Sequence, residues 1–197
     1  MTRIIGGVAG SLKLASPAKT TRPTSDRVRE SIFSRLDSQG TLPGARVLDI
    51  YAGTGALALE SLSRGATFAS MIEKNRQAAA VCEQNAKKVA KALEAEEISG
   101  EWHVRVAEAK HFLKSLAGSK FEELEGPINI VFVDPPYEVT GEAVAEELAE
   151  LLQYLAKDFT VIVERSSRSA DITWPAGYQV ELRKDYGDTS VFWLERA

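Results

Sequence analysis

Apolar segments of strand length alternate with segments of helical periodicity through the middle of this 197-residue chain. The expected strands cover residues 45–52, 67–75, 102–109, 128–136 and 159–166. The helices expected between them cover residues 55–65, 76–97, 110–118 and 141–156. Strands that are apolar on both faces and alternate with helices predict a parallel sheet covered by helices on both sides. This pattern places the chain in the α/β class.

Two further regions flank this body. Residues 177–196 predict two strands around a turn at residues 186–188, which would add antiparallel strands at one edge of the sheet. Residues 1–21 predict two short strands, and residues 22–36 predict a helix. We therefore expect a small β-hairpin extension at residues 1–21 and one domain at residues 22–197.

The composition excludes several classes of protein. Apolar residues make up 44% of the chain and charged residues 26%, which is enough for a sizeable core. The sequence contains no apolar run close to the ~20 residues of a membrane helix, and residues 1–10 lack the apolar region of a signal peptide. We therefore expect a cytoplasmic protein with no membrane partner. With Cys82 as the only cysteine and His103 and His111 as the only histidines, we expect no disulfide framework and no metal site.

The net charge of −4 hides an asymmetry. Residues 1–46 hold eight Lys and Arg against three Asp and Glu, whereas the rest of the chain is acidic. A basic segment of this kind suits contact with nucleic-acid phosphates. The alternative is a solvated face in which Arg27 and Arg29 pair with Asp26 or Glu30.

A glycine-rich turn joins the first strand of the body to its helix. Asp49 ends the strand and Gly53 and Gly55 follow, so the backbone can turn tightly and approach a ligand closely. The N-terminus of the next helix adds unpaired N–H groups. Glu73 ends the second strand, where an acid can accept hydrogen bonds from ribose hydroxyls.

Two cofactors fit this turn. The spacing Gly53-x-Gly55-x-x-Ala58 followed by Glu73 satisfies the loose dinucleotide fingerprint of an NAD-linked oxidoreductase. Asp49 before the glycines suits a cationic, amino-acid-like ligand better, and S-adenosylmethionine (SAM) is such a ligand. A βα turn without any ligand is the third interpretation.

The tetrapeptide Asp134-Pro135-Pro136-Tyr137 directly follows a strongly apolar strand. Two prolines end the strand and stiffen the backbone at the edge of the sheet where ligands bind. The tetrapeptide resembles the (Asn/Asp)-Pro-Pro-(Tyr/Phe) motif of SAM-dependent methyltransferases that act on planar amines. The lone pair of such an amine is delocalised into the ring. Acceptors at the Asp134 carboxylate and the Pro135 carbonyl, with the Tyr137 ring stacked on the base, would favour a reactive nitrogen. Whether Asp134 also takes the proton stays open.

Several segments occur together in one order along nearly the whole chain. They are RIIGG (3–7), RPTSDRVRESIF (22–33), VLDIYAGTGALALESLSRGA (47–66), MIEKN (71–75), DPPY (134–137) and YGDT (186–189). Together they resemble the RsmD-type bacterial methyltransferases, which modify the N2 amine of a guanine in 16S ribosomal RNA. The resemblance implies a Rossmann-like SAM-dependent methyltransferase fold, with a seven-stranded, mostly parallel sheet and an N-terminal β-hairpin extension. It implies 16S rRNA or the small ribosomal subunit as the substrate, and we expect a monomer.

The resemblance also assigns roles to residues. The methionine part of SAM is expected at the turn, on Asp49, Tyr51, Ala52, Gly53 and Gly55. Its ribose is expected on Glu73, and its adenine beside Lys74, Glu108 and Ala109. The family often has Asp-Ala at the last two positions, so the acid here is longer by one methylene. The guanine is expected on Asp134, Pro135, Pro136 and Tyr137. The RNA phosphates are expected on Arg3, Lys13, Arg22, Arg27 and Arg29.

Three alternatives stay open at this point. The first is the same chemistry on another amine, such as adenine N6 in DNA or a glutamine side chain. The second is the NAD-linked oxidoreductase. The third is an RNA-binding protein that is not catalytic and keeps SAM for stability.

Overall fold

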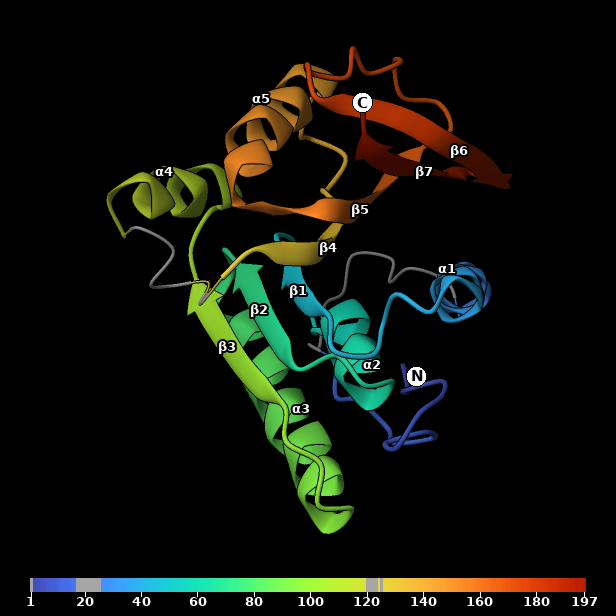
Figure 1. The fold of residues 1–197 in the computed structure, drawn as a ribbon, viewed down its shortest axis with the longest axis vertical. Coiled ribbons are helices and arrows are strands. Elements are labelled where there is room, and N and C mark those ends of the chain that lie inside the picture. Colours follow the sequence, from blue (N-terminus) through green and yellow to red (C-terminus); the bar gives the residue numbers. More distant parts are fainter. Residues whose placement is uncertain (1, 17–25, 120–123, 125) are drawn as a thin grey trace.

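A seven-stranded mixed sheet forms the centre of the protein (Figure 1). The computed structural model describes residues 2–16, 26–119, 124 and 126–197. The strand order is β3-β2-β1-β4-β5-β7-β6. The strands are β1 (Arg46–Asp49), β2 (Phe68–Glu73), β3 (Glu101–Val106), β4 (Ile128–Val133), β5 (Leu155–Ser166), β6 (Tyr178–Tyr186) and β7 (Thr189–Arg196). The first five strands in this order run parallel, and β7 is antiparallel to both β5 and β6. The predicted seven-stranded, mostly parallel sheet is confirmed.

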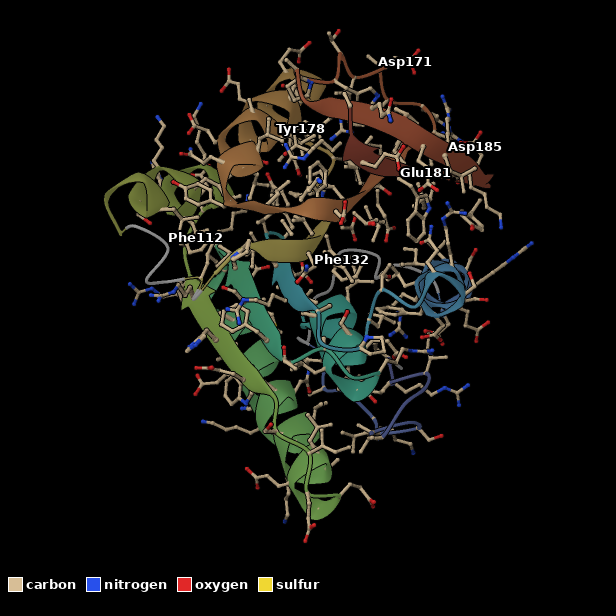
Figure 2. The ribbon with its side chains drawn as sticks, in the orientation of Figure 1. Phe112, Phe132, Asp171, Tyr178, Glu181 and Asp185 are labelled. Atoms are coloured by element: carbon tan, nitrogen blue, oxygen red, sulfur yellow. The ribbon has the colours of Figure 1, made fainter. Side chains whose placement is uncertain are left out.

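Helices cover both faces of the sheet. They are α1 (Asp26–Gln39), α2 (Ala56–Ser63), α3 (Arg76–Ala95), α4 (Ala109–Ser119) and α5 (Gly141–Leu151), followed by a short 3-10 turn, η1 (Leu152–Tyr154). One apolar cluster joins α1, α2 and α3 to one face, and a second joins α4 and α5 to the other. On the first face, the Phe132 ring of β4 lies 6.0 Å from the Phe33 ring of α1 (Figure 2). Within the described residues, no helix is both long and apolar enough to span a membrane.

Several boundaries differ from the sequence-based expectation: the strands expected at residues 45–52 and 102–109 end at Asp49 and Val106, and the strand expected from residue 159 begins at Leu155. Two further differences have a clear physical cause. The strand predicted at residues 128–136 ends at Val133, because the two prolines that follow have no N–H to donate. The helix predicted at residues 141–156 ends at Leu151, and β5 already begins at Leu155 after the turn of η1. Both differences lie at ends of elements, where sequence patterns are weakest.

The described part of the N-terminal extension, residues 2–16, is named here the N-terminal arm. It pairs with itself through a single antiparallel bridge between Arg3 and Lys13. Backbone bonds of 2.9 Å from Ile4 N to Leu12 O and from Leu14 N to Thr2 O support this pairing. The arm therefore has the path of a hairpin but contains no extended strands.

Helix α2 holds the arm through buried polar side chains. The Glu60 carboxylate, which is 0% exposed, accepts hydrogen bonds from Ile5 N at 2.6 Å and Gly6 N at 2.8 Å. The Ser63 hydroxyl accepts from Ala9 N at 2.9 Å and donates to Gly6 O at 2.7 Å. The arm therefore has a fixed place on α2, as Figure 1 shows at the N-terminus.

The arm also lies too close to α2 for a side chain at one position. Gly7 has a φ of +72°, and a Cβ atom there would lie 1.9 Å from the carbonyl oxygen of Ser63. Only glycine fits this contact.

The hairpin formed by β6 and β7 contacts α1 and holds it in place. The hydroxyl groups of Ser31 and Tyr186 form a hydrogen bond, and Arg35 forms an ion pair with Glu181. Figure 2 labels Glu181 and Asp185 on β6, the strand that faces α1. Tyr186 of the YGDT segment therefore has a structural contact that fixes the position of α1.

Candidate active site

The carboxyl ends of β1, β2 and β4 bring the predicted ligand-binding residues to one edge of the sheet. Asp49, the last residue of β1, is in register with Met71 of β2 and Phe132 of β4. Glu73 ends β2, and Asp134 directly follows β4. Parallel strands point their carboxyl ends the same way, so these three acids share one edge.

Asp49 is a buried carboxyl group with like charges around it. It is 1% exposed, and burial raises its pKa from 3.8 to about 8. The Tyr51 N–H opposes this rise, whereas the carboxylates of Asp134 and Glu73 add to it. The group is therefore mostly neutral at pH 7, and a bound cation would favour its charged form.

The two glycines of the turn serve different purposes. Gly55 precedes α2 with a φ of +81°, and a Cβ atom there would lie 2.7 Å from the Cys82 Sγ and 3.1 Å from the Met71 Sδ. Gly53 has a φ of +53°, but a Cβ atom there would meet nothing within 4 Å. Gly55 therefore permits close contact between the turn and α3, while Gly53 leaves open space above the backbone for a ligand.

Glu73 is held in place by the backbone on both sides of the turn. One carboxylate oxygen accepts from Gly53 N at 2.9 Å, and the other accepts from Asn75 N at 2.7 Å. Asn75 in turn caps α3, because its side chain accepts from the N–H groups of Gln77 and Ala78. Each oxygen of Glu73 keeps a lone pair for a further donor.

The residues expected near an adenine lie at the same edge, beyond β2 and β3. Lys74 is exposed after β2, Glu108 is exposed after β3, and Ala109 is buried at the start of α4. The Glu108 carboxylate lies 3.3 Å from the His111 imidazole. Its charge also contributes to a raised pKa of Tyr51, which places Glu108 near the turn.

The tetrapeptide after β4 forms a braced loop with an exposed ring. Pro135 is buried, whereas the Tyr137 side chain is 76% exposed. The loop closes through a 3.0 Å bond from Val139 N to Pro136 O. The guanidinium of Arg165, near the carboxyl end of β5, donates to Val139 O at 2.8 Å. The chain thus holds the tetrapeptide firmly and leaves an aromatic face available at the edge.

Tyr51 connects the glycine turn to α5. Its hydroxyl donates to the buried Glu147 carboxylate, with distances of 2.8 and 2.9 Å to the two oxygens. Burial raises the pKa of both groups. The hydroxyl of Tyr51 is therefore engaged with α5, so its contribution to a ligand would come from its ring or backbone.

Sequence reasoning missed Glu147 and Arg165. Both carried a readable signal. Glu147 falls on the apolar stripe of α5, between Val144 and Leu148. Arg165 lies near the carboxyl end of an apolar strand, at the edge where ligands bind.

The basic residues of the first segment divide into exposed and buried ones. Arg3, Lys13 and Arg27 are exposed. Arg29 is 1% exposed, and its guanidinium donates to Arg3 O at 3.0 Å and to Asp26 at 2.6 Å. The prediction that Arg29 contacts RNA is therefore wrong, because its charge is used inside the protein to join α1 to the arm.

Two remaining expectations concern Arg22 and metal binding. Arg22 lies outside the described residues. Within the described residues, no group of three or more His, Cys, Asp and Glu side chains is placed to hold a metal ion.

Comparison with known proteins identifies relatives over the whole length. The chain is 36% identical over 198 residues to Ribosomal RNA small subunit methyltransferase D of Escherichia coli K12, covering 98% of this chain and 89% of that protein. The solved structure of yhhF from Escherichia coli superposes with a TM-score of 0.76 at 33% identity, covering 98% of this chain and 97% of that chain. Magnesium protoporphyrin IX methyltransferase from Synechocystis PCC 6803, solved with bound SAM, has the same fold at 14% identity, with a TM-score of 0.61 and coverage of 87% and 79%.

The fold and these relatives define the class, a methyltransferase with a Rossmann-like fold. Residues 2–195 match the family described as Conserved hypothetical protein 95, and the chain belongs to this family. The resemblance to the RsmD-type methyltransferases is confirmed.

The two glycines make a matched pair of substitutions. We expect Gly55→Ala to lower the free energy of unfolding by about 3 kcal/mol, because the new methyl group is strained at positive φ and overlaps buried sulfur atoms. Gly53→Ala introduces only the backbone strain at positive φ, without a steric overlap, and should lower the free energy of unfolding by about 1 kcal/mol. Urea denaturation measures both values, and equal losses would contradict the different roles assigned to the two positions.

Proposed function

We propose that the protein transfers one methyl group from SAM to the N2 amine of a guanine in 16S ribosomal RNA. It would act as a monomer in the cytoplasm, on the RNA or on the small ribosomal subunit. One observation carries the proposal. The tetrapeptide Asp134–Tyr137 lies at the same sheet edge as buried Asp49 and the glycine turn, in a chain similar to a small-subunit rRNA methyltransferase over its whole length.

The residues at the turn fit SAM. Asp49 would accept hydrogen bonds from the α-ammonium group of SAM. The N-terminus of α2, which has no side-chain cap, would suit the carboxylate of SAM. Glu73 would accept from the ribose hydroxyls with the lone pairs that Gly53 and Asn75 leave unused. The adenine would lie beside Lys74, Glu108 and Ala109. The methionine part would be surrounded by the turn residues Tyr51, Ala52, Gly53 and Gly55.

The same edge disfavours a dinucleotide. A pyrophosphate at this turn would meet the carboxyl groups of Asp49, Glu73 and Asp134, which already act on one another electrostatically. The negative charge of a pyrophosphate would be repelled by these carboxylates, which opposes its binding. A cation, such as the ammonium and sulfonium groups of SAM, relieves that repulsion.

The tetrapeptide would hold the target base. The Asp134 carboxylate and the Pro135 carbonyl would accept the N–H bonds of the guanine amine, and the exposed Tyr137 ring would stack on the base. SAM supplies a methyl group on a positive sulfur atom. The fixed orientation would direct the N2 lone pair at this carbon. The N–C bond would form as the C–S bond breaks, the sulfur would leave as a neutral thioether, and one N2 proton would pass to Asp134 or to water.

The exposed arginines and lysine of the first segment would bind RNA phosphates. Arg3 and Lys13 are bridge partners on the N-terminal arm, so their side chains leave the arm at the same place. Arg27 is exposed on the first turn of α1, and Arg22 is a further candidate in the sequence. Neutralising charges of this kind lowers the salt dependence of RNA binding.

The first test is methyl transfer to small ribosomal subunits from a strain that lacks the modification. We expect Asp134→Ala to lower kcat at least about 100-fold, since it removes an acceptor at the reacting amine, with the Kd for SAM within about tenfold. Glu138→Ala, an exposed neighbour, is the control and should keep activity within about twofold. Full activity of Asp134→Ala would refute the mechanism, and a methyl group mapped to any atom other than guanine N2 would refute the substrate.

The affinity for SAM should depend on pH through Asp49. Below its raised pKa of about 8 the group is protonated and cannot pair with the ammonium, so affinity should rise from pH 6 to 8 and then level off. Titration calorimetry measures this, with a rise of up to about tenfold per pH unit. Asp49→Asn should bind weakly with a flat profile, and an unchanged slope in that variant would assign the pH dependence to another group.

The salt dependence of RNA binding tests the arm. We expect the double variant Arg3→Gln/Lys13→Gln to bind small-subunit RNA more weakly and to lower the slope of log Kd against log salt concentration by about 1.5. The control is Lys87→Gln/Lys91→Gln, which removes two exposed charges from α3. Equal slopes for both double variants would contradict the proposal that the arm contacts the RNA.

A further inference from the structure

One buried side chain connects the N-terminal arm to the glycine turn. Asn85 lies on the inward face of α3 and is 0% exposed. Its Oδ1 accepts from Ala15 N at 2.8 Å. Its Nδ2 donates to Ala15 O at 3.1 Å and to Thr54 O at 3.0 Å. Ala15 belongs to the arm, and Thr54 lies between the two glycines of the turn.

These three bonds differ from the other contacts of the arm. Glu60 and Ser63 join the arm to α2 and have no bond to the turn itself. Within the described part of the chain, Asn85 is the side chain whose hydrogen bonds reach both the arm and the turn. Because the carboxamide is planar and buried, a displacement of Thr54 O would strain the bonds to Ala15 at the same time.

The helix that carries Asn85 is itself connected to the cofactor edge. At its N-terminus, the capping residue Asn75 donates its backbone N–H to Glu73. Two turns further on, Cys82 lies so close to Gly55 that no side chain fits between them. A ligand that fixes Glu73 and the turn would therefore also fix the N-terminal part of α3, which leads to Asn85.

We propose that Asn85 is a positioning residue that couples cofactor binding to RNA binding. The inference rests on the proposed function, in which SAM binds at the turn and RNA binds on the arm. A cofactor that orders the turn fixes Thr54 O, and through Asn85 it fixes both backbone groups of Ala15. The RNA then meets an arm whose end at Ala15 is held more firmly, beyond the part that α2 already holds, so the two ligands bind cooperatively. By linkage, RNA must strengthen cofactor binding by the same factor.

The test measures how strongly cofactor binding and RNA binding affect each other in the full-length chain. The Kd for unmodified small ribosomal subunits is determined with and without saturating S-adenosylhomocysteine, which occupies the cofactor site without reacting. We expect a tightening of about five- to tenfold in the wild type. In Asn85→Ala the factor should fall below about twofold, while each ligand still binds alone.

Ser63→Ala is the matched control. It also removes a side chain that makes two hydrogen bonds to the arm, but these bonds join the arm to α2. We expect weaker RNA binding with the coupling factor retained. A purely structural role of Asn85 would lower affinity or stability in both variants alike, so equal loss of coupling in the two variants overturns the proposal.

A second measurement needs no variant and applies even where Asn85→Ala fails to fold. Hydrogen exchange at the Ala15 amide, which donates to Asn85, should slow at least about threefold when S-adenosylhomocysteine binds. Unchanged exchange, or wild-type binding of both ligands without coupling, overturns the inference and leaves the proposed function standing. Failure of the wild type to bind either ligand would overturn both.

Discussion

Parallel pairing of β1 with both β2 and β4 is the constraint on which the site depends. It brings Asp49 beside the ends of two neighbouring strands, so that the carboxyl groups of Glu73 and Asp134 act on it. Side chains alternate along a strand, so a register shift of one residue would turn Asp49 toward the opposite apolar cluster. The sheet thus maintains an unfavourable concentration of acids at one edge. The cationic cofactor proposed above would relieve this repulsion.

Buried polar residues on helices join peripheral segments to the body of the protein. Glu60 on α2 binds the backbone of the arm, Asn85 on α3 binds the arm and the turn, and Glu147 on α5 binds Tyr51. Each lies among apolar neighbours on a buried helix face. Polar groups in such positions specify one arrangement, because any other would leave them buried without partners.

The sequence predicted the sheet, the glycine turn and the tetrapeptide, because these rest on local patterns. The prediction failed where a charged residue was assigned a role without considering which face of its helix it lies on. Arg29 belongs to the stripe that continues with Ile32, Phe33 and Leu36 at spacings of three, four and seven residues, so helical periodicity already placed it inside. Glu147 follows the same rule on α5. The pair of Arg29 with Asp26 was the alternative that the sequence offered, and it is confirmed. The bonds of Arg29 to Arg3 O and of Glu147 to Tyr51 join residues far apart in sequence, and only the fold reveals them.

If RNA binds on the arm as proposed, the length of α2 affects which part of that RNA can reach the tetrapeptide. The glycine turn begins this helix, and Glu60 and Ser63 in its second half hold the arm. Its eight residues span about 12 Å, so α2 acts as a molecular ruler between the cofactor edge and the arm. One additional helical turn would move the arm by about 5 Å, more than the rise of about 3.4 Å per nucleotide along one strand of a duplex. The length of one short helix would thereby help decide which base of a bound RNA is presented for reaction.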